Sequence, residues 1–152
     1  MRVFRDDAWL GCFLAMIFGA GVVLGGCRAT IKYSYDHTAD FSTYKSYSWT
    51  SAPFHEESLI EKNVRYYADQ SLKDKGFVLT SNNPDFVVSI VCNTDYTHPY
   101  KVRLLNLYIY RAKGKELIWQ GTAEGSLKAD AASSDLAEAV KKILANFLPE
   151  KR

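Results

Sequence analysis

The sequence has few cysteines and histidines and lacks the short motifs that carry most enzyme chemistry. Its 152 residues include three cysteines and three histidines. There is no Cys-x-x-Cys pair, phosphate-binding glycine loop or Ser-His-Asp nucleophile elbow. The histidines, His37, His55 and His98, stand apart in the sequence, whereas zinc needs three or four ligands held together. We therefore predict no catalytic residue, no metal and no cofactor, and a protein that is not an enzyme.

Strong charge of one sign is also missing. Nineteen Lys and Arg residues against seventeen Asp and Glu residues give a net charge of +2, and the lysines are scattered among acids. This balance excludes a nucleic-acid partner. No low-complexity tract interrupts a chain that is 47% hydrophobic and 14% aromatic, which indicates one ordinary domain with a buried core.

One uncharged apolar run, residues 8–24, precedes Gly25-Gly26-Cys27. A membrane-spanning helix needs roughly 20 apolar residues, and this run of 17 is somewhat short for one. Small residues before a cysteine resemble the lipobox of bacterial lipoproteins, in which the thiol takes a diacylglyceryl group and the preceding peptide is removed. We predict a signal peptide over residues 1–26, cleavage between Gly26 and Cys27, lipidation of Cys27 and a single domain over residues 27–152. An uncleaved anchor, or a buried helix with an incidental cysteine, remains the alternative.

A lipidated Cys27 would determine where the protein resides. Three fatty-acyl chains, palmitate among them, exceed the two signals that stable membrane attachment requires. In two-membrane bacteria, an aspartate after the cysteine tends to retain a lipoprotein in the inner membrane, and here the residue is Arg28. We therefore expect a lipid-anchored protein of the outer membrane that faces the periplasm.

Only Cys92 then remains as a free thiol. It alternates with Phe86, Val88 and Ile90 along an expected strand, so all four share one face. A single thiol has no internal disulfide partner, and we predict a buried structural cysteine.

Two helices are expected. Ser58 and Glu61 have capping-box spacing, an apolar stripe follows, and Gly76 is placed to end the helix. The second helix begins near Ser134-Asp135 and ends before Pro149. Its apolar stripe is expected to pack on a sheet, with docking of a partner as the alternative; it comprises Leu136, Val140, Ile143, Leu144 and Phe147.

Period-two alternation and turn residues indicate strands over residues 30–36, 45–50, 77–80, 86–92, 102–112 and 116–127. The last alternates apolar Leu117, Trp119, Gly121 and Ala123 with polar residues, as in an antiparallel sheet covered on one side. The predicted fold is α+β: an antiparallel sheet of about four to six strands with two helices on one face, forming a two-layer sandwich.

Several short motifs resemble one family. They are Tyr35-Asp36, the stretch 40–49 (DFSTYKSYSW), Lys75-Gly76-Phe77, Pro84-Asp85-Phe86 and Trp119-Gln120-Gly121. In this order they resemble the bacterial envelope lipoproteins of the domain-of-unknown-function family DUF4136, over nearly the whole mature chain. The resemblance implies an outer-envelope lipoprotein with an α+β domain and supplies no catalytic residues. Residues 93–100 form a shorter segment than is frequent in that family.

Aromatic residues are abundant and fall in two groups, one within residues 33–49 and one formed by Tyr96, Tyr100, Tyr108 and Tyr110. Aromatic rings with hydroxyls bind glycans or lipids, but they also pack on pleated sheets. Because binding residues concentrate on loops, we predict that Tyr96, His98 and Tyr100, in a loop over residues 93–100, edge any binding surface.

Three functions follow from these patterns. The first is a non-enzymatic module, held at the membrane by its lipid, that binds another envelope protein, a lipid or a glycan. The alternative is a carrier or sensor of a small lipid or glycan in an aromatic-lined pocket. A hydrolase is the third and depends on His98 with Asp95 alone.

Overall fold

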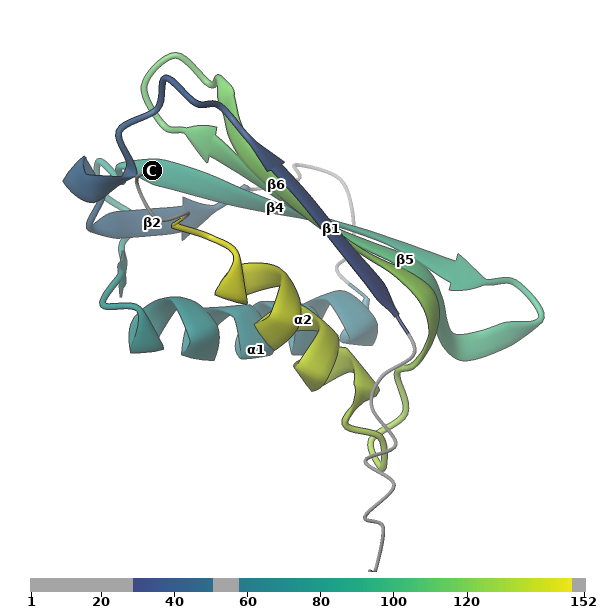
Figure 1. Cartoon of the computed structure of the whole chain (residues 1–152). Helices are drawn as coiled ribbons and strands as arrows, with labels where there is room; N and C mark the ends of the chain where they lie inside the picture. Colours follow the sequence, from purple (N-terminus) through teal and green to yellow (C-terminus); the bar gives the residue numbers. More distant parts are fainter. Residues whose placement is uncertain (1–28, 51–57, 149–152) are drawn as a thin grey trace, which may run out of the picture.

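The computed structural model describes residues 29–50 and 58–148, which form a sheet with two helices on one face (Figure 1). In chain order the elements are β1 (Thr30–Tyr35), a 3-10 turn (Phe41–Thr43), β2 (Ser46–Trp49), α1 (Leu59–Asp74), β3 (Val78–Leu79), β4 (Phe86–Asp95), β5 (His98–Arg111), β6 (Leu117–Lys128) and α2 (Asp135–Ala145). Within these residues, neither helix is long and apolar enough to cross a membrane.

The six strands lie in the order β1-β6-β5-β4-β2-β3. The α+β class with two helices on one face is confirmed. The sheet is mixed, however, because β2 runs parallel to both β4 and β3, while the pairs β1–β6, β6–β5 and β5–β4 are antiparallel. The parallel β2–β3 pair arises because α1 is a crossover connection that returns the chain to the same end of the sheet.

The first helix forms as its sequence predicts. The Ser58 hydroxyl accepts from the Glu61 amide, and the Glu61 carboxylate accepts from the Ser58 amide, which completes the capping box. Gly76 adopts a φ of 89°, a conformation that ends helices readily only when no Cβ is present. The buried residues of α1 are Val64, Ala68 and Leu72.

The second helix packs on the sheet and on α1, and this confirms the packing interpretation of its apolar stripe. Phe147, just beyond the helix, is fully buried. Its ring centroid lies 5.5 Å from those of Phe86 and Trp119 and 5.9 Å from that of Phe41. The C-terminal helix is thereby joined to three separate strands or turns by ring contacts.

The predicted alternation of β6 is correct except at its start. Trp119, Gly121 and Ala123 are buried on the helix-covered face. Leu117 is 44% exposed and Ile118 is buried instead, because the β5–β6 register shifts there. A bulge of this kind reverses the side-chain alternation locally.

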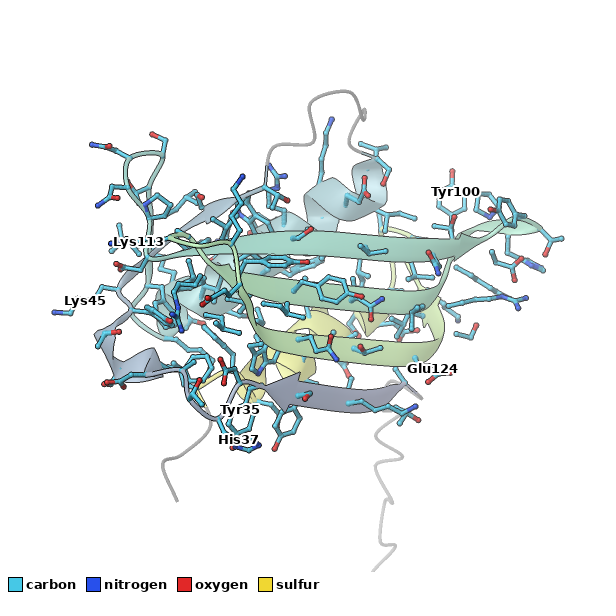
Figure 2. The ribbon with its side chains drawn as sticks, turned by 90° about the horizontal axis from the view of Figure 1, so that it is seen from above. Tyr35, His37, Lys45, Tyr100, Lys113 and Glu124 are labelled. Carbon is cyan, nitrogen blue, oxygen red and sulfur yellow. The ribbon has the colours of Figure 1, made fainter. Side chains whose placement is uncertain are left out.

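The two helices leave the opposite face of the sheet uncovered, and this face carries both charged and uncharged side chains (Figure 2). Lys32 on β1 forms an exposed 2.9 Å ion pair with Glu124 on β6. The Thr122 hydroxyl donates to the Asn106 side chain at 2.7 Å, and this satisfies the one buried polar residue among the described positions.

Candidate functional site

The segment over residues 93–100 is a hairpin rather than a loop, which corrects the sequence interpretation. Strand β4 continues to Asp95 and β5 begins at His98, so only Tyr96 and Thr97 form the turn. His98 and Tyr100 therefore lie on a strand. The loop prediction failed because backbone pairing continues through irregular register shifts that leave no period-two pattern in the sequence. The hairpin projects from one end of the sheet (Figure 1).

Asp95 organises the turn. Its Oδ1 accepts hydrogen bonds from the Thr97 amide at 2.9 Å and the Thr97 hydroxyl at 2.6 Å. Its Oδ2 accepts from Nε and Nη2 of Arg103 at 3.1 and 2.8 Å. The hydrogen bond from the Thr97 hydroxyl, followed by that from Arg103, lowers the pKa of Asp95 well below its usual range. Its carboxylate therefore stays charged and holds the turn closed.

This geometry gives Asp95 and His98 a structural role. Nδ1 of His98 lies 3.6 Å from Oδ2 of Asp95 and 2.9 Å from the Thr97 hydroxyl. Both carboxylate oxygens of Asp95 are already engaged by Thr97 and Arg103, and the bond to the Thr97 amide is that of an Asx turn. The proximity that suggested an acid–base pair thus belongs to a turn, with the imidazole exposed beside it.

The hairpin tip, defined here as residues 95–101, presents tyrosines to solvent. The Tyr96 side chain is fully exposed and that of Tyr100 is 66% exposed. Lys101 pairs directly across the ladder with Lys128. Among residues 29–50 and 58–148, no carboxylate forms an ion pair with either lysine. Two like charges directly opposite each other destabilise a sheet pair, and the nearby Asp135 carboxylate accepts a hydrogen bond from the Lys128 amide at 3.1 Å.

The other predicted positions have separate locations. Cys27 and Gly26, the predicted lipidation and cleavage positions, lie outside the described residues, as does His55. The His37 ring packs 4.5 Å from the Tyr35 ring. In the described ranges, no group of three or more His, Cys, Asp or Glu side chains is placed to hold a metal ion.

Cys92 shares the helix-covered face of β4 with Phe86, Val88 and Ile90, as predicted, and it is half-buried against the core. Burial, with a smaller contribution from the charge of Glu61, raises the pKa of the Cys92 thiol to about 12. The thiol is therefore protonated near neutral pH, as expected of a packing residue.

Most of the first aromatic group belongs to the core. The Tyr47 and Phe86 rings stack 5.7 Å apart, and the Phe77 ring meets the Phe86 ring edge-on at 5.1 Å. These rings fill the space between sheet and helices, the same space in which a carrier would need its pocket. The aromatic abundance of residues 33–49 is thus explained largely by packing.

Sequence reasoning missed a polar site beneath β2. Asp69 of α1 accepts hydrogen bonds from the Tyr47 hydroxyl at 2.6 Å and from the Trp49 indole at 2.9 Å. Burial, followed by the hydrogen bond to Asp69, raises the pKa of Tyr47. A groove of about 320 Å³ runs beside these residues, lined also by Phe77 and Leu79. The sequence signal for this site was an acidic residue, Asp69, directly after Ala68 of the apolar stripe of α1.

Solved structures share this fold. A PelC dodecamer from Paraburkholderia phytofirmans is 14% identical, with a TM-score of 0.57 over 77% of this chain and 95% of that chain. A DUF4136 family protein from Bacteroides thetaiotaomicron is 13% identical, with a TM-score of 0.59 over 77% of this chain and 94% of that chain. A PDZ domain protein from Parabacteroides distasonis is 12% identical, with a TM-score of 0.59 over 82% of this chain and 36% of that chain. At these identities the similarity shows the fold alone.

A comparison with curated protein sequences finds no match. The model of DUF4136, described as a domain of unknown function, matches residues 31–149. This match begins at the second residue of β1 and extends past the end of α2, so it includes part or all of every element described above. The chain therefore belongs to the DUF4136 family.

Proposed function

We propose that the protein is a non-enzymatic lipoprotein of the bacterial outer membrane, anchored through lipidated Cys27 on the periplasmic side. Its domain binds another envelope component through the hairpin tip. The observation that carries this proposal is the projecting hairpin tip with exposed Tyr96 and Tyr100, whose rings are not part of the core. A hairpin whose turn is closed by the hydrogen bonds of Asp95 presents these rings at low entropic cost.

The lipobox and the fold support the anchor together. The first described strand begins at Thr30, three positions after Cys27 in the sequence, and pairs with β6. A lipid on that cysteine would hold the domain close to the bilayer. The exposed tyrosines would then meet membrane-proximal components first.

The anchor is tested by expressing the full chain and a Cys27→Ser variant in a two-membrane bacterium supplied with labelled palmitate. The full chain should take up the label, lose residues 1–26 and fractionate with the outer membrane. Cys27→Ser should be unlabelled and uncleaved at Gly26. A Cys92→Ser variant is the matched control and should be labelled like the original. Equal labelling of Cys27→Ser and the original chain would overturn the proposal.

A further inference from the structure

Strand order places the hairpin tip and the N-terminal end of β1 at the same end of the molecule. Strands β1, β6, β5 and β4 are antiparallel neighbours, so β1 begins where β6 ends, β5 begins and β4 ends. Figure 2 shows this end, with Tyr100 and Glu124 labelled near it and Lys45 and Lys113 near the other. The chain leading back to Cys27 therefore leaves the domain at the same end as the hairpin.

The reach of the two segments is matched. Thr30 pairs with Glu124, Glu124 pairs with Leu104, and Leu104 pairs with Asn93, which sets one level across four strands. From this level Tyr96 lies three residues further out along β4, about 10 Å of extended strand, and the bulged β5 contributes more residues over the same stretch because Asp95 pairs with His98. Cys27 is also three residues from Thr30, so it reaches at most about 10 Å from the same level. A flat surface that contains Cys27 is therefore within reach of the hairpin tip.

The chemistry of the tip suits the headgroup layer of a bilayer. Tyrosine is enriched at this depth because its ring is apolar and its hydroxyl is polar. The facing Lys101 and Lys128 would gain from anionic phosphates. Asp95, the acid within the tip, is neutralised by Arg103 at 2.8 Å.

We propose that the hairpin tip inserts Tyr96 and Tyr100 among the phospholipid headgroups of the bilayer that holds the acyl chains of Cys27. This inference deepens the proposed function and rests on its lipid anchor, and it names the envelope component as the phospholipid surface. The lipid on Cys27 precedes β1, and the hairpin tip joins β4 to β5, so the two attachments to the membrane lie toward opposite edges of the strands β1, β6, β5 and β4. Together they would fix the orientation of the domain, including α1 and the open face of the sheet, relative to the membrane.

The test uses the mature lipidated protein reconstituted in vesicles of phosphatidylethanolamine and phosphatidylglycerol, with or without brominated acyl chains that quench tryptophan. Two variants each add one tryptophan: Tyr96→Trp at the tip, and Leu79→Trp as the matched control. Leu79 is 53% exposed on β3, at the opposite end of the sheet. Both variants share the background emission of Trp49 and Trp119.

We expect brominated lipid to quench the tryptophan added by Tyr96→Trp and to leave that of Leu79→Trp unaffected. Adding Lys101→Glu and Lys128→Glu should reduce the quenching of the tip. If the protein floats with the vesicles but the tip is not quenched, the hairpin contact is wrong and the anchor stands. In intact cells, crosslinking of the tip to an envelope protein in place of lipid would likewise overturn the contact alone. If the protein does not float at all, the anchor and the contact both fail.

Discussion

The guanidinium of Arg103 donates two hydrogen bonds to Oδ2 of Asp95 across the base of the β4–β5 hairpin, at 3.1 and 2.8 Å. Because Oδ1 of the same carboxylate receives the amide and hydroxyl of Thr97, one side chain closes the turn and joins it to β5. We expect Asp95→Ala to accelerate hydrogen exchange of the Thr97 amide while leaving that of core β5 amides unchanged. Asp95→Asn, which keeps an oxygen acceptor for Thr97, should show a smaller effect.

The pH dependence of this turn follows from the lowered pKa of Asp95. A carboxyl whose folded pKa lies below its unfolded value, about 3.9, stabilises the folded turn above that value. The contribution is lost only as the pH falls from about 4 through the lowered pKa. We therefore predict that protection of the Thr97 amide persists at about pH 4, measured by NMR, and disappears only in stronger acid. Loss of protection between about pH 6 and 5 would contradict this.

Asp69 is predicted to be the most consequential polar residue of α1. Asp69→Ala leaves the Tyr47 hydroxyl and Trp49 indole without their acceptor, and an unsatisfied buried donor costs about 1–3 kcal/mol. Tyr47→Phe removes one hydrogen bond and should cost about 1 kcal/mol. Urea denaturation measures both changes. Exposed Asp74 lies on the same helix, and Asp74→Ala should change the free energy of unfolding far less.

The number and reactivity of thiols test both the processing of the N-terminal segment and the burial of Cys92. If Cys12 is removed with the signal peptide and Cys27 carries lipid, then only Cys92 of the three cysteines remains as a thiol. The mature protein in denaturant should therefore react with one equivalent of Ellman's reagent. Under native conditions near pH 8 the reaction should be slow, because burial raises the pKa of Cys92 to about 12. Rapid native reaction would show that the helices do not cover this side chain of β4.

Gly121 is expected to tolerate no side chain. A Cβ at this position would overlap the Trp119 ring and lie 2.5 Å from Cγ2 of Ile143 on α2. Overpacking of this kind costs about 1–3 kcal/mol, so Gly121→Ala should lower the melting temperature measurably. The neighbouring Gln120→Ala, on the exposed face of β6, is the matched control and should leave it nearly unchanged.

Local signals in the sequence predicted the helices and the long strands, because caps and periodicity act over a few residues. The capping box of Ser58 and Glu61 and the φ of Gly76 are examples. The direction of β2 depends on pairing between residues far apart, such as Tyr47 with Phe86, and no local pattern encodes it. The hairpin was misread as a loop for a related reason, since Asp95 is held by Arg103 from the next strand.

The pairing of β1 with β6 also constrains the order in which the fold can be completed. Lys32 and Glu124, which meet across this pair, are 92 residues apart in the chain. A polypeptide that emerges from a ribosome or an export pore with its N-terminal side first exposes β1 long before β6 exists to receive it. Non-local pairing of this kind slows folding and leaves a strand edge open meanwhile. The earliest strand to emerge is thus among the last to be secured.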